Sequence, residues 1–137
     1  MTNSATSSTK GRFIKFAISG AVGFLVELCI TLGLVHYVLI HPVIAKLLAF
    51  PVAVLTTWVI NRNFAFRQQA RESLPKELFR YFETTVTGAI ANNLIYIGLL
   101  SLLEGSAIVI TTATAAGALS GMLVNYFGAK HYVFKNL

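Results

Sequence analysis

The stretch that decides the fold covers residues 43–60 and reads VIAKLLAFPVAVLTTWVI. It is apolar except for a few side chains, and at about 1.5 Å of rise per residue it is close to the length that crosses a bilayer. Three further apolar runs of similar length cover residues 13–35, 84–103 and 107–127. A helix at the surface of a soluble bundle needs a polar face, which these runs lack. The sequence therefore predicts an all-α membrane protein with four transmembrane helices.

The bulk composition also indicates that a bilayer is the solvent of this fold. Of the 137 residues, 55% are hydrophobic and only 12% are charged, and the mean hydropathy is +0.70. Soluble proteins carry roughly 25% charged residues. The single cysteine, Cys29, lies in an apolar run and has no partner for a disulfide within the chain. We expect a disordered polar tail over residues 1–11 and a single transmembrane domain over residues 12–135.

The connections between the apolar runs predict two tight hairpins. Residues 36–42 and 104–106 are short, whereas residues 61–83 form the one long polar connection. Within that connection, Ser73 is a suitable N-cap and Pro75 suits the first turn of a helix. We therefore expect an interfacial amphipathic helix there that leads into the third span.

The basic residues predict the orientation of the chain. The net charge is +6, and every lysine and arginine except Lys46 falls before or at the start of the first span, in the middle connection or after the fourth span. The positive-inside rule then places both termini and the middle connection in the cytoplasm. Because the basic residues flank apolar spans, they indicate membrane orientation and anionic lipid as a partner, and not nucleic acid.

The two halves of the chain, residues 12–67 and 78–135, resemble each other. The matching segments are FIKF (13–16) with FRYF (79–82), 66 residues apart, and NRNFAF (61–66) with AKHYVF (129–134), 68 residues apart. Both halves are hairpins that enter the membrane from the same side. The sequence therefore predicts a parallel repeat, related by an axis along the membrane normal.

Together these features resemble the GtrA family of small four-helix bacterial membrane proteins, over about residues 11–135. The segments that carry the resemblance are RFIKF (12–16) followed by Gly20 and Gly23, NRNFAF (61–66), RYF (80–82), NYF (125–127) and YVF (132–134). The chain departs from the family pattern in its second half, where Lys130 and His131 stand for a more basic pair. The function of that second exit segment is therefore less well defined by the resemblance.

The resemblance implies translocation of a polyprenyl-phosphate-linked sugar across the bacterial cytoplasmic (inner) membrane. This flipping would serve cell-surface polysaccharide synthesis or O-antigen modification, with the sugar lipid and a membrane glycosyltransferase as partners. Two alternatives remain open. The first is a membrane anchor or assembly subunit of such a glycosyltransferase that transports nothing, and the second is a small multidrug-type proton antiporter.

Polar residues inside the spans are candidates for a substrate pathway. Glu27 is the clearest, because a carboxylate near the centre of a span costs about 2.5–3.5 kcal/mol and needs a partner or a function. At the 66-residue offset it matches Asn93, which lies beside Asn92 and near Tyr96 in the third span. These residues predict a polar path for a sugar, with hydrogen bonding between helices as the alternative. Lys46, at the outer interface, is a candidate contact for an anionic ligand.

A second group of candidates lies at the ends of the second and fourth spans. Arg62 and Lys130 occupy matching positions, and Asn61 and Asn125 lie beside or near them. Cations at a membrane edge suit the phosphate of a lipid carrier, although anchoring to anionic lipid explains them equally well.

Small residues predict where the helices pack against each other. Gly20 and Gly23 lie in the first span, and Gly117 and Gly121 in the fourth. Glycines at such spacing let another helix approach closely, within one chain or between two. Since four helices enclose little volume, we expect a homo-oligomer or a partner subunit.

Nothing in the sequence predicts catalysis. It contains no Ser/His/Asp set, no metal-ligand spacing and no glycine-rich phosphate loop. We therefore expect no enzymatic activity, no bound metal and no cofactor.

Overall fold

The computed structural model describes residues 4–67, 72–104 and 106–134, and every element of regular secondary structure in these ranges is helical. The elements are α1 (Ser4–Tyr37), α2 (Pro42–Ile60), η1 (Asn61–Ala65), α3 (Leu74–Leu102), α4 (Ala107–Gly128) and η2 (Ala129–Val133). Each η element is a single π-helical turn that continues the helix before it. Four helices are long and apolar enough to cross a membrane. The prediction of an all-α membrane protein with four spans is therefore confirmed.

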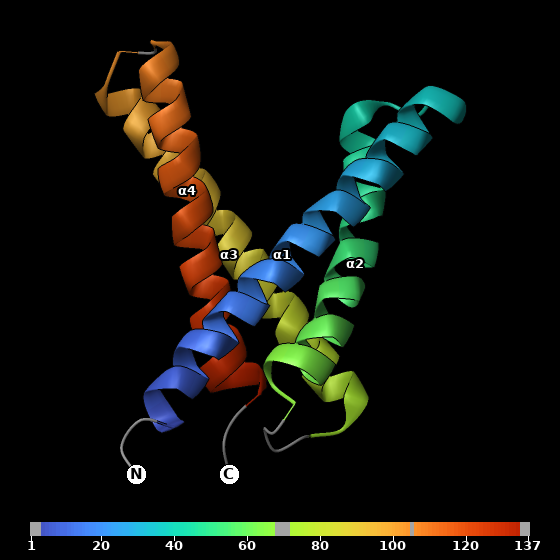
Figure 1. The fold of residues 1–137 in the computed structure, drawn as a ribbon. Coiled ribbons are helices and arrows are strands. Elements are labelled where there is room, and N and C mark those ends of the chain that lie inside the picture. Colours follow the sequence, from blue (N-terminus) through green and yellow to red (C-terminus); the bar gives the residue numbers. More distant parts are fainter. Residues whose placement is uncertain (1–3, 68–71, 105, 135–137) are drawn as a thin grey trace. The chain divides into compact units, whose positions relative to one another are not determined.

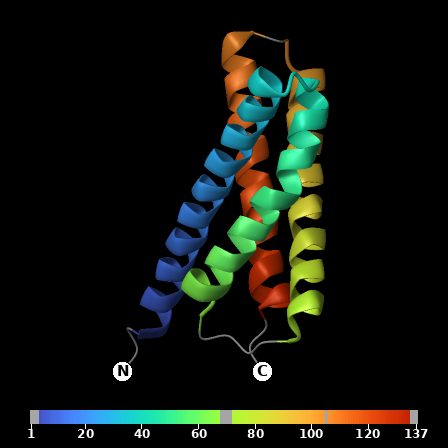
Figure 2. The same cartoon turned by 90° about the vertical axis from the view of Figure 1, so that its right-hand side faces the viewer.

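The chain folds as two compact helical hairpins, unit 1 (Met1–Gln69) and unit 2 (Ala70–Leu137). Within unit 1, α1 packs along α2, and within unit 2, α3 packs along α4 (Figures 1 and 2). In each unit the π-helical turn lies beside the start of the unit's first helix. We call this the basic end of the unit, because it carries Arg12, Lys15 and Arg62 in unit 1, and Lys76, Arg80 and Lys130 in unit 2.

The starts of three helices follow from local chemistry. The α2 helix begins with Pro42, and the Nδ1 atom of His41 accepts a hydrogen bond from the backbone N–H of Val43 at 3.3 Å. The α4 helix begins after Ser106, whose Oγ accepts from the N–H of Val109 at 3.3 Å. Helix α3 begins directly after Ser73, as the sequence predicts, with Pro75 in its first turn, but the Ser73 side chain makes no capping hydrogen bond.

Helices α1 and α3 both extend further than the sequence predicts. The expected interfacial helix and the third span form one continuous helix, because no proline interrupts α3 after its first turn. The α1 helix begins at Ser4, within the segment that we expected to be a disordered tail, and residues 1–3 lie outside the described part. A helix already formed in an apolar span lengthens at little cost, since each added residue brings its own hydrogen bond.

The two units bury matching positions along their second helices. The buried pairs are Ala45 and Ala113, Ala49 and Gly117, Ala53 and Gly121, Asn61 and Ala129, Ala65 and Val133, and Phe66 and Phe134. Every pair is 68 residues apart, and the π-helical turns η1 and η2 share the same spacing. This spacing is the one that the sequence predicts for NRNFAF and AKHYVF.

The first helices of the two units match at a different spacing. The buried pairs are Phe16 and Tyr81, Ser19 and Thr84, and Gly23 and Gly88, each 65 residues apart. The expected offset of 66 is therefore wrong for the buried faces of these helices, and Glu27 corresponds to Asn92 instead of Asn93. The FxxF motif misaligns the faces by one residue, which is a rotation of about 100° around a helix axis.

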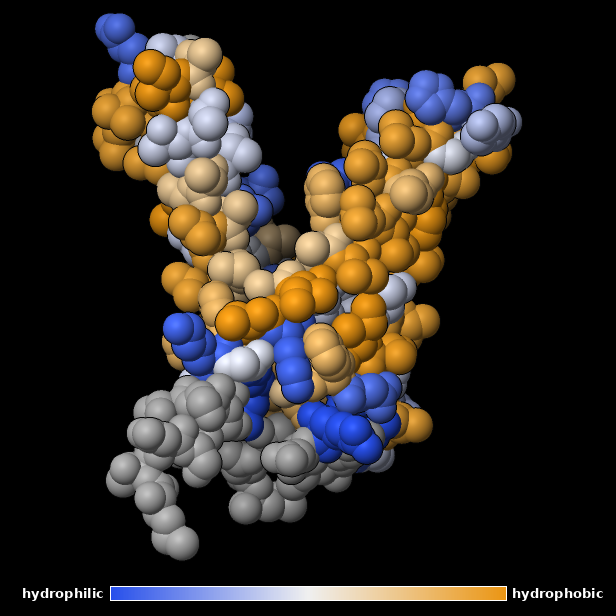
Figure 3. Space-filling model, in the orientation of Figure 1, coloured by the Kyte–Doolittle hydropathy of each residue, from blue (hydrophilic) through white to orange (hydrophobic). Residues whose placement is uncertain are grey.

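Large apolar side chains cover much of the outer surface of both hairpins. Phe24 is 63% exposed and Leu47 is 68% exposed in unit 1, and Leu94 is 65% exposed in unit 2. Figure 3 shows apolar residues along much of the visible length of the helices. Hydrocarbon around the helices accounts for this exposure, and the hydrogen bonds within each helix satisfy the backbone there. The chain is a multi-pass membrane protein.

Candidate functional site

The basic end of unit 1 places cations over aromatic rings. Lys15 Nζ lies 4.9 Å from the centroid of the Phe64 ring, which belongs to η1. Two further pairs at this end are Arg12 with Phe66 at 5.7 Å and Arg62 with Trp58 at 5.8 Å. Contacts of this kind attract the cation to the face of the ring and are worth about 0.5–1 kcal/mol at exposed sites. They hold the positive charges at the end of the hairpin.

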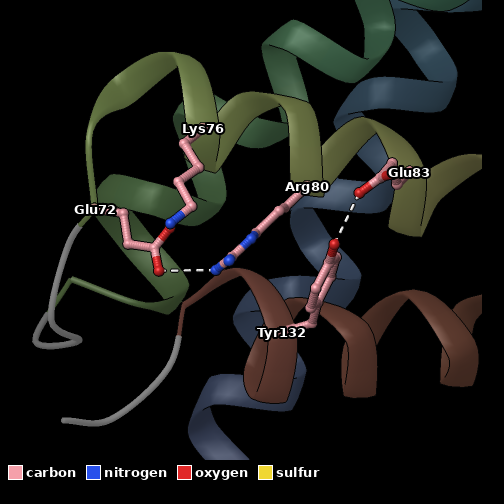
Figure 4. Close-up of polar contacts among 5 residues, drawn as sticks. All are labelled: Glu72, Lys76, Arg80, Glu83 and Tyr132. Carbon is pink, nitrogen blue, oxygen red and sulfur yellow. Dashed lines mark hydrogen bonds and ion pairs between the residues drawn. The ribbon is translucent and has the colours of Figure 1, made fainter.

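The basic end of unit 2 contains the corresponding pair and an ion-pair cluster. The guanidinium of Arg80 lies 5.1 Å from the centroid of the Tyr132 ring, at the positions that match Lys15 and Phe64. Arg80 also donates a hydrogen bond to Glu72 at 2.8 Å, and Lys76 Nζ lies 3.4 Å from the same carboxylate (Figure 4).

The charge of Glu72 is maintained by its two basic neighbours. Partial burial raises the pKa of the Glu72 carboxyl, but the hydrogen bonds and positive charges of Lys76 and Arg80 outweigh this effect. The net result is a pKa below the ordinary value for glutamate. Arg80 therefore faces a charged carboxylate on one side and an aromatic ring on the other.

A groove lies next to this cluster, between α3 and the end of α4. The hydroxyl of Tyr132 in η2 donates a hydrogen bond to Glu83 Oε2 in α3 at 2.9 Å, and Figure 4 shows the two side chains pointing toward one another. The groove has a volume of about 370 Å³. Its lining residues are Glu83, Thr84, Thr87, Val124, Gly128 and Tyr132.

The shape of the groove depends on a missing side chain. A Cβ added to Gly128 would meet the methyl group of Thr84. The hydroxyls of Thr84 and Thr87 donate to backbone carbonyls of their own helix, at 2.9 Å to Arg80 and 2.8 Å to Glu83. Their oxygen atoms, together with the carboxylate of Glu83, place hydrogen-bond acceptors along a groove whose lining is otherwise largely apolar.

The structure separates the two asparagines of the predicted pathway. Asn92 packs against α4, since its Oδ1 lies 2.5 Å from the place where a Cβ on Gly117 would stand. Asn93 is exposed, and its Nδ2 donates to the backbone carbonyl of Ala89 at 2.8 Å. Glu27, in α1, is half-buried. The two adjacent amides therefore have different surroundings, as their 100° separation around the helix requires.

The other pathway and phosphate candidates occupy mixed environments. Tyr96 is half-buried and Lys46 is exposed. Arg62 and Lys130 are half-buried within η1 and η2, at matching positions. Asn61 is only 1% exposed, so its side chain lies inside unit 1 and not at a surface that a lipid phosphate reaches.

Asn125 belongs to the contact between α3 and α4. Its Oδ1 occupies the space that a Cβ on Gly88 would need, and this buried oxygen accepts no hydrogen bond from the described residues. Asn125 is a phosphate candidate by sequence, whereas the structure places it in a helix contact one turn before η2. We did not identify Gly88 from the sequence, because it is an isolated glycine in the third span.

Three of the four predicted packing glycines lie in helix contacts. Gly23 faces Thr57 of α2, Gly117 faces Asn92, and the backbone oxygen of Gly88 lies 2.8 Å from where a Cβ on Gly121 would stand. Gly20 differs, since it is exposed and no described atom lies within 4 Å of its added Cβ. Gly20 therefore takes no part in the contact between α1 and α2, and a packing role for Gly20 elsewhere stays a prediction.

The groove residues were not found by sequence reasoning. The sequence marks Glu83 only as the end of the middle connection, and Tyr132 only as a member of the repeated segment AKHYVF and of the family segment YVF. A comparison of the two halves at the correct offsets of 65 and 68 would have marked them, because Glu83 then matches Ile18 and Tyr132 matches Phe64. Among the described residues, no three His, Cys, Asp or Glu side chains gather into a group that holds a metal ion.

The comparison with known proteins agrees with this architecture. The family model described as GtrA/DPMS, transmembrane domain, matches residues 15–134, a range that includes both hairpins and both π-helical turns. No curated protein matches the chain closely enough to count as a relative. On the strength of the family match, the chain belongs to the GtrA/DPMS transmembrane-domain family, which is associated with the handling of lipid-linked sugars.

Proposed function

We propose that this protein translocates a polyprenyl-phosphate-linked sugar across the bacterial cytoplasmic membrane, for use in cell-surface polysaccharide synthesis. The observation that carries the proposal is the pair of matching cation–aromatic contacts, Lys15 with Phe64 and Arg80 with Tyr132. Both lie at the basic end of a hairpin with an apolar exterior. A cation held on a ring at the edge of a membrane suits a lipid phosphate, while the prenyl chain stays in hydrocarbon.

The proposed mechanism divides the lipid into three parts. The phosphate binds at the basic ends, which face the cytoplasm under the positive-inside rule. The prenyl chain lies against the exposed apolar faces of the helices. The sugar crosses along polar side chains, for which Glu27 in α1 and the exposed Asn93 in α3 are the candidates at depth. Asn92 is less suitable, because it packs against a glycine of α4.

The protein acts in this proposal without a catalytic step or a cofactor. A membrane glycosyltransferase makes the lipid-linked sugar on the cytoplasmic side and is the natural partner. Because each hairpin has only two helices, several copies in a homo-oligomer would together line a longer path for the sugar than one copy does.

Translocation is tested with the purified chain in proteoliposomes that contain undecaprenyl-phosphate-linked glucose with a radiolabel. A reagent that does not cross the bilayer, such as periodate, reports how much sugar reaches the outer leaflet. We expect the protein to expose nearly all of the labelled lipid, whereas protein-free vesicles expose only the outer-leaflet share. Arg80→Gln slows the exchange, and Lys10→Gln, which removes a charge from an exposed side chain near the N-terminus, leaves it unchanged.

Each alternative has its own outcome in these vesicles. If the protein exposes no additional sugar but co-purifies with a glycosyltransferase, it is an anchor and the proposal fails. If it instead releases an organic cation in response to a pH gradient, it is a proton antiporter. The variant Glu27→Gln separates transport from anchoring, because loss of exchange with intact partner binding supports transport.

A further inference from the structure

The two hairpins have matching buried contacts, but they differ at the surface that forms the groove in unit 2. In unit 2 the lining of the groove is Glu83, Thr84, Thr87, Val124, Gly128 and Tyr132. At the offsets of 65 and 68, the matching residues of unit 1 are Ile18, Ser19, Val22, Thr56, Ile60 and Phe64. Three of these six positions are polar in unit 2 and apolar in unit 1. A fourth position has glycine in unit 2 and isoleucine in unit 1.

These differences lie at the surface of the hairpin, and the buried contacts that hold its two helices together match between the two units. Both units keep a small buried residue at the crossing of their helices, Gly23 in unit 1 and Gly88 in unit 2. Both units also keep a ring contact between the first helix and the residue after the π-helical turn, at 6.3 Å for Phe16 with Phe66 and 6.2 Å for Tyr81 with Phe134. The polar side chains of the groove are therefore not needed to form a hairpin of this type.

The chemistry of the groove selects its ligand. Tyr132 donates its hydroxyl proton to Glu83, and both threonine hydroxyls donate to backbone carbonyls, so the groove presents oxygen atoms that accept hydrogen bonds. In the described part of unit 2, Tyr132 is the only side chain that donates to Glu83. A carboxylate repels a phosphate but accepts readily from hydroxyl groups, and such charge-assisted hydrogen bonds are the stronger kind. A sugar supplies several hydroxyl donors.

The groove also has a cation at its edge. Arg80 lies one helical turn before Thr84 on α3, and its guanidinium lies 5.1 Å from the ring centroid of Tyr132, which lines the groove. A sugar phosphate whose sugar occupies the groove would have its phosphate beside this guanidinium. The volume of about 370 Å³ lies within the roughly 300–1,000 Å³ that small-molecule sites occupy.

We propose that this groove of unit 2 binds the sugar of the lipid-linked substrate, and that unit 1 contributes no equivalent site. The inference rests on the proposed function, since that function supplies the ligand. It adds that Glu83, Thr87 and Tyr132 recognise the sugar hydroxyls while Arg80 meets the phosphate. The second hairpin therefore determines which sugar is accepted.

The test compares the binding of two lipids to the full-length protein in nanodiscs. One lipid is undecaprenyl phosphate, and the other is the same lipid bearing glucose, galactose or N-acetylglucosamine. The variants are Tyr132→Phe, Thr87→Val and Glu83→Gln, of which the first two introduce the residue found in unit 1. We expect each to weaken binding of the best sugar lipid by about tenfold, with at most a twofold effect on undecaprenyl phosphate.

A matched control comes from unit 1. Val22→Thr adds a hydroxyl at the position that corresponds to Thr87, in the hairpin that has the apolar Ile18 where unit 2 has Glu83. We expect this variant to bind every lipid as the wild type does. Tyr132→Phe is also the least disruptive change in the groove, because it removes one oxygen atom and keeps the ring under Arg80.

Three results would overturn the inference. In the first, the wild type binds no sugar lipid more tightly than undecaprenyl phosphate. In the second, the variants keep full affinity for the sugar lipid. In the third, the variants lose affinity for both lipids equally. The first two leave the groove without a sugar, and the third assigns it to the phosphate. If the protein still translocates the lipid in the vesicle assay, the proposed function stands even when one of these results is obtained. If the protein binds neither lipid, both proposals fail.

Discussion

The side-chain oxygen of Asn125 in α4 occupies the space that a Cβ on Gly88 in α3 would need. Unit 1 repeats this relationship with different chemistry, because the methyl group of Thr57 in α2 occupies the space above Gly23 in α1. In both hairpins, therefore, a polar residue of the second helix packs onto a glycine of the first. Van der Waals packing of this kind is a main source of helix association in lipid, where no hydrophobic force draws helices together.

Gly88→Ala and Gly23→Ala are each expected to destabilise the protein by about 1–3 kcal/mol, because the added methyl group forces the two helices of a hairpin apart. Thermal unfolding in detergent measures the loss. Gly98→Ala in α3 and Gly20→Ala in α1 are the controls, since nothing lies within 4 Å of their added Cβ atoms. Equal destabilisation by a control variant would show that close packing is not the cause.

The two adjacent asparagines of α3 are expected to respond differently to the same substitution. Asn92→Leu places a larger group against Gly117 and Gly121, and we expect a loss of about 1–3 kcal/mol through overpacking. Asn93→Leu changes an exposed side chain that bonds only its own helix, and we expect an effect within about 0.5 kcal/mol. Unfolding midpoints in detergent give the comparison, and the reverse order would contradict the packing of Asn92 on α4.

Glu72 is expected to compete with lipid phosphate for Arg80. In Glu72→Gln the guanidinium loses its anionic partner at 2.8 Å, so binding of undecaprenyl phosphate to nanodiscs should become a few-fold tighter. Glu104→Gln, an exposed carboxylate in the connection between α3 and α4, is the control and should not change affinity. Unchanged binding in Glu72→Gln would mean that Arg80 does not contact the phosphate.

The same pair predicts a pH dependence with a definite sign. Because the folded-state pKa of Glu72 is lowered, its pairing with Arg80 is fully present above the ordinary glutamate pKa of about 4.3. The pairing is lost only as the pH falls through the lower folded-state value. Wild type and Glu72→Gln should therefore differ in affinity at neutral pH and converge in acid, which a pH series of the binding measurement checks.

Cysteine labelling tests the expected orientation. In a Cys29→Ser background, Ser73→Cys should react with a membrane-impermeant maleimide only in inverted membrane vesicles, because the middle connection is expected in the cytoplasm. Glu104→Cys, at the opposite end of unit 2, should react only from the outside of intact cells. Both side chains are exposed, so access is set by the membrane. Labelling with the opposite sidedness would invert the topology.

Hydropathy and the lengths of the connections are enough to predict the spans and their pairing into hairpins. Residues 43–60 and 107–127 became α2 (Pro42–Ile60) and α4 (Ala107–Gly128) almost unchanged, because insertion into a bilayer depends on the summed hydropathy of about 20 residues. The 68-residue spacing of NRNFAF and AKHYVF was also available from the sequence. The connections at residues 36–42 and 104–106 are so short that the two spans on either side of each one must form a hairpin.

The face of each helix that meets its partner could not be predicted from hydropathy and came from the folded structure. It corrected the match of Glu27 from Asn93 to Asn92, removed Gly20 from the helix contact, and brought Glu83 to Tyr132 across 49 residues. The physical reason is that lipid and protein interior are both apolar in a membrane protein. Hydropathy therefore does not distinguish the buried side of a span from the lipid-facing side, and an error of one residue turns the helix by about 100°.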